Sequence, residues 1–250
     1  MIVTISGQYG SGGNEIGTRV AEALNYKVLD SQLIVRAREI YTEISKSKNK
    51  PDWWPARNLV PFNEANDFPR LASALGQAEM KQKTDLFDMA ANYSSYGDES
   101  ENIRRAMLEA QTKAIMEYSE GGNCLLFGKG SNYILRGRPD TIHAFTTADM
   151  EVRIRRIMNL YNFNADKISQ SKWMPPSYTL QEAGQFLDME RRDAIDLIYT
   201  TDKRRADFFE FLTGEKWGGE SEYIDYQING NDEDLKAETD RFLKFIREKM

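Results

Sequence analysis

The sequence predicts an α/β fold built on a doubly wound parallel sheet. Short β-branched and apolar runs alternate along the chain with stretches of helical periodicity. No hairpin dipeptide joins one apolar run to the next, which favours βαβ units over antiparallel strands. The 250 residues suit a single domain over residues 1–250 that is large enough to carry insertions.

Five strands are expected, at residues 2–5, 26–30, 124–127, 141–147 and 226–229. The first is β-branched at every position, which is typical of a strand buried on both faces of a parallel sheet. The carboxyl ends of parallel strands lie along one edge of the sheet, and ligands bind at that edge. The residues that follow strands there are Gly7, Asp30, Gly128 and Thr147.

Helices are expected at residues 15–24, 31–44, 101–120, 149–161, 181–199, 201–214 and 232–250. In the first helix, Ile16, Val20 and Leu24 fall four residues apart and form one apolar stripe. Ser31 is the expected N-cap of the second helix. Right-handed crossovers between parallel strands place such helices on both faces of the sheet.

Residues 45–100 interrupt this alternation and are interpreted as an insertion on one side of the sheet. The stretch "SKSKNKPDWWPARNLVP" is polar and broken by prolines, and "NYSSYGDESEN" is typical of a loop. Trp53 and Trp54 are expected to anchor the insertion by packing, in preference to forming a platform for base stacking.

Composition excludes several classes of function. The net charge of −6 argues against binding to nucleic-acid polymers or membrane surfaces, which need a basic face. No apolar stretch reaches the roughly 18 residues that span a bilayer, and no basic segment typical of a secretory signal opens the sequence. The single cysteine, Cys124, cannot form an internal disulfide, so a reducing cytoplasm is expected. The only histidine, His143, lies within a strand and is expected to be buried and structural, which leaves no zinc site or catalytic triad.

A glycine-rich loop connects the first strand to the first helix. Its glycines are Gly7, Gly10, Gly12, Gly13 and Gly17, within the stretch "GQYGSGGNEIG". Glycine lacks a Cβ and adopts positive φ angles, so a loop of this kind lets main-chain N–H groups converge on a phosphate at the positive end of a helix dipole. A tight strand-to-helix turn would also account for two or three of these glycines. Five of them predict a phosphate site.

The loop departs from the usual phosphate-binding pattern at one end. The spacing of Gly7 and Gly12 matches the start of G-x-x-x-x-G-K-[ST], but Gly13 and Asn14 stand where lysine and a hydroxyl residue are expected. The dinucleotide pattern G-x-G-x-x-G does not fit either, because Glu15 stands where its last glycine would be. The positive charge must therefore come from another part of the chain.

Six blocks of the sequence together resemble the cytidylate kinase-like family, a branch of the P-loop nucleoside monophosphate kinases. The blocks are "ISGQYGSGGNEIG", "VLDSQLI", "LLFGKGSNYILRGRP", "ADMEVRIRRIM", "DKRRADFFEFLTGEKWG" and "YIDYQIN". They occur in order over roughly residues 1–40 and 104–230. The glycine loop of that branch commonly lacks the lysine, so the resemblance implies that its absence here is a trait of the group.

The resemblance implies a role for individual residues of the loop and of the acceptor site. Gly10, Ser11, Gly12 and Gly13 would surround the triphosphate of ATP. Apart from the resemblance, Gly7 is assigned to the same phosphate site, and Asn14 is expected to hold a metal-bound water in place of the missing hydroxyl. Asp30, Ser31, Arg36 and Lys129 would face the acceptor, close to the insertion at residues 45–100. Lys129 replaces the arginine of the family's usual Gly-Arg-Gly, which changes how an anion can be bound there.

The resemblance also implies a lid that supplies positive charge to the transferring group. Its arginines would be Arg153, Arg156, Arg204 and Arg205, and residues 162–200 would form an extended lid insertion. Arg153 and Arg156 share a helix face because they are three residues apart, which suits either a clamp on phosphate or a solvated surface. One well-placed arginine accelerates phosphoryl transfer by about 10³–10⁵, so a set of them can offset a missing lysine.

The sequence thus predicts an ATP- and Mg²⁺-dependent kinase of a small phosphorylated acceptor, with CMP-like or dCMP-like nucleotides as the first candidates. The sequence does not identify the Mg²⁺ ligands, because Asp30 would serve equally as a helix cap. Two alternatives stay open. One is a nucleotide-binding sensor or partner-binding protein without turnover, and the other is a kinase of a different small metabolite.

Overall fold

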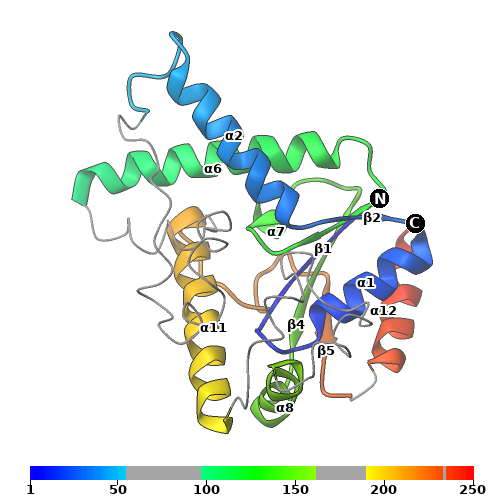
Figure 1. Cartoon of the computed structure of the whole chain (residues 1–250). Coiled ribbons are helices and arrows are strands. Elements are labelled where there is room, and N and C mark those ends of the chain that lie inside the picture. The colour runs from blue at the N-terminus through cyan, green and yellow to red at the C-terminus, as the bar shows by residue number, and fades with distance from the viewer. Residues whose placement is uncertain (55–96, 162–189, 233–234) are drawn as a thin grey trace.

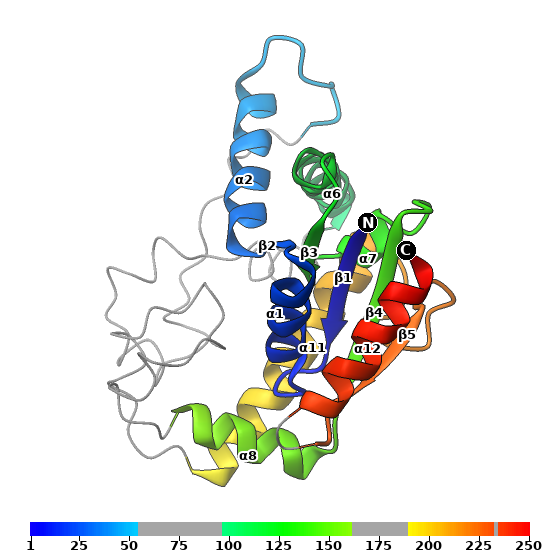
Figure 2. The same ribbon diagram turned by 90° about the vertical axis from the view of Figure 1, so that its right-hand side faces the viewer.

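The computed structural model describes residues 1–54, 97–161, 190–232 and 235–250. Five strands form one parallel sheet in the spatial order β2-β3-β1-β4-β5 (Figure 1 and Figure 2). Their bounds are β1 Ile2–Gly7, β2 Lys27–Leu29, β3 Cys124–Phe127, β4 Thr141–Thr147 and β5 Tyr226–Asn229. All five expected strands are therefore present, and the parallel sheet predicted from the sequence is confirmed.

The N-terminal strand β1 is the centre of the sheet. It pairs in parallel with β3, where Ile2 aligns with Cys124, and with β4, where Ile2 aligns with Thr141. Its residues alternate between the two faces, and Ile2, Val3 and Ile5 are almost fully buried. The glycine loop thus begins at the middle of the carboxyl edge, with strands on both sides.

Helices cover both faces, as a doubly wound sheet requires. Their bounds are α1 Gly13–Leu24, α2 Ser31–Lys46, α6 Gly97–Ser119, α7 Ser131–Ile134, α8 Met150–Tyr161, α11 Arg191–Thr213 and α12 Lys236–Lys249. Helices α1 and α12 pack together on one face through Val20, Phe242 and Ile246 (Figure 2). On the opposite face, Leu33 of α2 and Ile115 of α6 pack against Leu126 of β3.

Several helix limits differ from the sequence-based expectation. Helix α1 begins at Gly13, ahead of Glu15, because Gly12 takes a left-handed conformation and ends the loop. Asp30, and not Ser31, is the N-cap of α2, and Ser31 is the first helical residue. Residues 191–213 form one continuous helix, so the predicted break between residues 199 and 201 is wrong. The short helix α7 carries too few residues for a periodic pattern to reveal it.

The described part of the insertion behaves as a packing anchor. Trp54 is buried, lies 5.1 Å from the ring of Tyr41, and donates a 2.9 Å hydrogen bond from Nε1 to Ser45 Oγ. The guanidinium of Arg105 lies 3.8 Å from the ring of Trp53. The remainder of the insertion, residues 55–96, and residues 162–189 of the expected lid lie outside the described residues. Residues 191–200 of that lid belong to α11.

His143 is a structural residue of β4, as expected. Its side chain is almost fully buried, and its Nδ1 lies 2.8 Å from Thr4 Oγ1 of the neighbouring strand. Burial lowers the pKa of His143 below its usual value. Among the helices in the described part of the chain, none has both the length and the apolar character needed to cross a bilayer.

Candidate functional site

The glycine loop lies at the carboxyl edge of the sheet, between β1 and α1. Gly10 and Gly12 have φ angles of 79° and 91°, which L-residues rarely adopt. A Cβ on Gly12 would lie 2.5 Å from Leu235 Cδ1, and one on Gly10 would lie 3.1 Å from the Arg153 carbonyl oxygen. Both positions therefore require glycine for backbone conformation and for space.

Four main-chain N–H groups of this loop are available to a ligand. Within the described part of the chain, those of Gly10, Gly12, Gly13 and Asn14 donate no hydrogen bond. The neighbouring N–H groups are engaged: Gln8 donates to the Thr146 carbonyl at 3.0 Å and Ser11 donates to the Gln8 carbonyl at 3.2 Å. The available groups surround the N-terminus of α1, where the helix dipole also favours an anion. Ser11 turns its own hydroxyl back onto the Gln8 carbonyl, at 2.6 Å.

Three of the four predicted lid arginines converge on this loop, and each contacts a loop carbonyl. Arg153 Nε donates to the Tyr9 carbonyl at 2.8 Å, and Arg205 Nη1 donates to the Gly7 carbonyl at 2.7 Å. Arg156 lies at the rim, with Nη1 3.5 Å from the Gly10 carbonyl oxygen. Arg204 occupies the same helix as Arg205 and is partly buried.

Arg153 differs from the mobile clamp that the sequence suggested. Its side chain is only 5% exposed, and its Nη2 forms an ion pair with Asp202 of α11. The expected split of α8 is present in part, because Ile154 and Ile157 are buried against α11. Arg153 is buried with them and is occupied by a carboxylate and a carbonyl.

The acceptor residues Asp30 and Lys129 are brought together. They form an ion pair whose side chains are 8% and 12% exposed, at the ends of β2 and β3. Lys129 has a φ angle of 57° between two left-handed glycines, Gly128 and Gly130, and Gln111 donates to its carbonyl. Asp30 makes no side-chain hydrogen bond as a cap of α2, so capping does not account for its carboxylate.

The structure does not bring Arg36 to this pair. Within the described residues, its side-chain contacts are with three carboxylates: Glu117 of α6 at 2.7 Å, Glu43 at 2.9 Å and Glu39 at 3.2 Å. These hydrogen bonds raise the pKa of Arg36, and the bond from Arg36 lowers the pKa of Glu117. Arg36 therefore joins α2 to α6, and its contact with an acceptor stays a prediction. Ser31 begins α2 beside Asp30.

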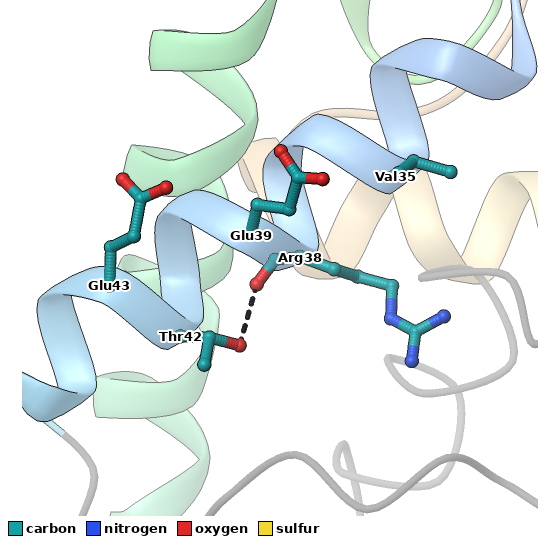
Figure 3. Close-up of a pocket in the computed structure, with 5 residues that line it drawn as sticks. All are labelled: Val35, Arg38, Glu39, Thr42 and Glu43. Atoms are coloured by element: carbon teal, nitrogen blue, oxygen red, sulfur yellow. Dashed lines mark hydrogen bonds between the residues drawn. The ribbon is translucent and has the colours of Figure 1, made fainter.

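A shallow hollow on α2 includes two of these carboxylates, Glu39 and Glu43. Figure 3 shows the side chains of Val35, Arg38, Glu39, Thr42 and Glu43 along one side of the helix. Its described lining comes from α2 alone and shares no residue with the glycine loop. We assign it no role in binding nucleotide.

Sequence reasoning missed several residues that shape the loop. Asp202 accepts a 2.7 Å hydrogen bond from the Tyr9 N–H, and its only sequence signal is its position three residues before Arg205. Thr146 Oγ1 is buried without a partner in the described structure, and it lies 2.8 Å from where a Cβ on Gly13 would stand. Gly230 passes so close to Ser11 that a Cβ there would overlap the Ser11 carbonyl oxygen. Contacts of this kind join residues far apart in the chain, so no local sequence pattern predicts them.

The sequence profile of the cytidylate kinase-like family matches residues 2–171, which is more than half of the chain. No curated protein sequence matches. Among solved structures, an uncharacterized protein from Eubacterium ventriosum has a TM-score of 0.53 at 17% identity, over 99% of this chain and 98% of that one. This likeness supports the fold.

Two further solved structures are more distant. A shikimate kinase from Bacteroides thetaiotaomicron has a TM-score of 0.42 at 14% identity, covering 99% of this chain and 97% of that one. A shikimate kinase from Acinetobacter baumannii, in complex with shikimate, has a TM-score of 0.39 at 14% identity, covering 99% and 93%.

Proposed function

The chain belongs to the cytidylate kinase-like family, and on that premise we propose that it transfers a phosphoryl group from ATP to a small phosphorylated acceptor. The first candidates for the acceptor are CMP and dCMP. The observation that carries the proposal is the set of available N–H groups at Gly10, Gly12, Gly13 and Asn14, at the start of a helix. Main-chain groups of this kind bind phosphate without any side chain.

The proposed ligand of these N–H groups is the triphosphate of ATP. The available N–H groups would hold the phosphates in place, and a fixed position is most of what phosphoryl transfer requires from a protein. Arg156 and Arg205 are partly buried guanidinium groups at the loop, so they bring charge close to an anion bound there. They are the arginines that we propose in place of the missing lysine.

Magnesium is proposed to arrive with the nucleotide. The described residues contain no group of three His, Cys, Asp or Glu side chains able to hold a metal. Mg²⁺ in kinases is held largely by phosphate oxygens and water with one or two protein ligands, so this composition is compatible with its use. Bound Mg²⁺ would neutralise the charge that develops on the transferred group. We assign it no ligand.

The acceptor is proposed to bind near Asp30 and Lys129. Both groups stand at the carboxyl edge, beside the loop in the sheet order, and together they offer a negative oxygen and a positive nitrogen. An ammonium group binds phosphate as a point charge, whereas an arginine grips two oxygens at once. A different small phosphorylated metabolite would therefore also fit.

The buried thiol of Cys124 suits a reducing compartment, and we propose a cytoplasmic location.

A second candidate function is nucleotide binding without turnover. The observation that favours it is the ion pair between Arg153 and Asp202, because it neutralises an arginine that would otherwise serve the transferred phosphate. A protein of this kind would bind ATP with the same loop. Addition of an acceptor would leave its affinity for ATP unchanged.

The test is an assay of ADP release with ATP and Mg²⁺ over all ribo- and deoxyribonucleoside monophosphates, run beside calorimetry with ATP alone. Turnover with CMP or dCMP supports the kinase. ATP binding without turnover on any acceptor supports the second candidate. Absence of ATP binding contradicts both, since both depend on the loop.

A further inference from the structure

We infer that Asp202 is the positioning residue of the phosphate loop. Its carboxylate lies on α11, almost two hundred residues from the loop in sequence, yet it holds the loop directly. The inference rests on the proposed function, since it gives this carboxylate a part in nucleotide binding. It assigns Asp202 a role in shaping the loop, with no contact to the nucleotide itself.

Asp202 and Arg153 together hold both polar atoms of one loop residue. Asp202 Oδ1 accepts the Tyr9 N–H at 2.7 Å, and Arg153 Nε donates to the Tyr9 carbonyl at 2.8 Å. The ion pair between Asp202 Oδ2 and Arg153 Nη2 closes the arrangement. Hydrogen bonds that involve charged groups are about twice as strong as neutral ones, so this residue is firmly fixed.

The same helix holds the loop at a second point. Arg205 lies three residues after Asp202, on the same face of α11, and donates to the Gly7 carbonyl at 2.7 Å. Its guanidinium also lies 5.4 Å from the ring of Tyr9. Helix α11 is itself anchored by buried residues, including Ile198 and Phe208. The loop is therefore fastened at residues 7 and 9, immediately before the first available N–H group.

This fastening matters because the residues that follow have little conformational preference of their own. Gly10 and Gly12 reach angles open to many other backbone states, and ordering one residue costs about 1–2 kcal/mol. A loop that is already ordered binds phosphate without that loss. Fixing Tyr9 sets the direction in which the chain enters Gly10 and hence where the available N–H groups point.

Because Asp202 is negatively charged, the direction of the change in phosphate affinity on its removal distinguishes a positioning role from a purely electrostatic one. A carboxylate near an anion site repels phosphate, so its removal would tighten binding if charge were its only effect. Removal would also release the guanidinium of Arg153 from its ion pair. A positioning role predicts the opposite outcome, which is weaker binding after the loss of a negative charge.

The test compares Asp202→Asn with Asp207→Asn. Asp207 lies on the same helix, is exposed, and pairs with Lys203 at 2.5 Å, so both variants lose one charge from α11. Calorimetry with ATP and with tripolyphosphate, both in EDTA, measures binding to the loop without metal. We expect Asp202→Asn to weaken both ligands about tenfold or more, and Asp207→Asn to leave them within about twofold. Unchanged or tighter binding by Asp202→Asn overturns the inference.

A second measurement decides the inference without any ligand. Hydrogen exchange of the free protein should become faster in Asp202→Asn across residues 7–13, with the core strands unchanged, and should stay unaltered in Asp207→Asn. Exchange that rises throughout the sheet indicates general destabilisation and overturns the positioning role. Failure of the wild type to bind ATP contradicts the proposed function, while the exchange result still confirms or overturns the hold of Asp202 on the loop.

Discussion

Gly12 shows how a single residue determines whether the loop can form. Its φ angle of 91° is one that L-residues rarely adopt, and a Cβ there would lie 2.5 Å from Leu235 Cδ1. Left-handed backbone costs a non-glycine residue roughly 1–2 kcal/mol, and overlap with Leu235 adds to that cost. Leu235 thus packs close to the start of α1 and leaves little space for a side chain at residue 12.

Gly12→Ala is expected to abolish ATP binding and to lower the free energy of unfolding by about 2 kcal/mol or more. Gly137→Ala is the matched control, because nothing lies within 4 Å of a Cβ there and its φ angle is ordinary. Calorimetry with ATP and urea unfolding measure the two effects. Tight ATP binding by Gly12→Ala would contradict the proposed role of this loop.

The ion pair of Asp30 and Lys129 leads to a second prediction. Lys129→Met leaves a buried carboxylate without its partner, which is expected to cost about 3 kcal/mol or more of unfolding free energy. The double variant Asp30→Asn, Lys129→Met removes both charges and should recover most of that loss. Urea unfolding at neutral pH provides the comparison. Equal stability of the wild type and Lys129→Met would show that the pair is unimportant to the fold.

At this scale the sequence reveals the residues of the loop but not the partners that hold them. The glycines are identified by their spacing, because the geometry of a phosphate loop demands them locally. Arg153 and Asp202 are 49 residues apart, and Lys129 and Asp30 are 99 apart. Such pairs form only when whole elements meet. Arg36 was assigned by resemblance to the acceptor site, and the carboxylate of Glu117 that it contacts lies 81 residues away.

Helices α2 and α6 form the largest helix–helix contact in the described structure, and the ion pair of Arg36 with Glu117 connects them at its edge. Beneath it, Ala37 and Ile40 of α2 and Ala106 and Ala110 of α6 are buried in one cluster. Small alanine side chains allow the two helices to approach closely, so the charged contact caps an apolar interface.

Glu117→Gln is expected to reduce the change in thermal stability between neutral and acidic pH. Because the hydrogen bond from Arg36 lowers the pKa of folded Glu117, its contribution is present at neutral pH and is lost as the pH falls through that lowered value. The variant should therefore melt below the wild type at pH 7, and the difference should vanish in acid. Thermal unfolding from pH 7 to pH 3 measures this. Glu120→Gln, at an exposed position just beyond α6, is the control.

Element limits follow the sequence where periodicity is long and fail where a local contact decides. Helix α8 and strand β4 lie within one residue of their predicted ranges. Helix α11 continues through residues 199–201, since nothing in "YTT" ends a helix once Ile198 and Phe208 are buried on either side. A short polar stretch is a weak signal beside that packing.

For the whole molecule, the parallel arrangement could be predicted and the spatial order of strands could not. Alternation of strands and helices fixes parallel pairing through right-handed crossovers. The order β2-β3-β1-β4-β5 depends on which strands pair, and β1 selects partners more than a hundred residues away. The resemblance supplied the cytidylate kinase-like family, which the profile match to residues 2–171 confirms.

The glycine loop follows β1 and contacts α8, α11 and the segment before α12. ATP bound to the loop should therefore stabilise the described fold as a unit. A ligand present at 100 times its Kd is expected to add about 2.7 kcal/mol to the free energy of unfolding. Urea unfolding with and without ATP, followed by both circular dichroism and tryptophan fluorescence, should shift to the same extent by each probe. A shift seen by fluorescence alone would indicate a local response.

The close approach of Gly230 to Ser11 has a consequence for the order in which a ribosome makes this protein. The loop is translated more than 200 residues before Gly230 and Leu235, the glycine and the leucine that lie against it. At roughly 5–20 residues per second, the nascent loop waits on the order of tens of seconds for that enclosure. The loop therefore reaches its packed form only after residues 230–235 have been made.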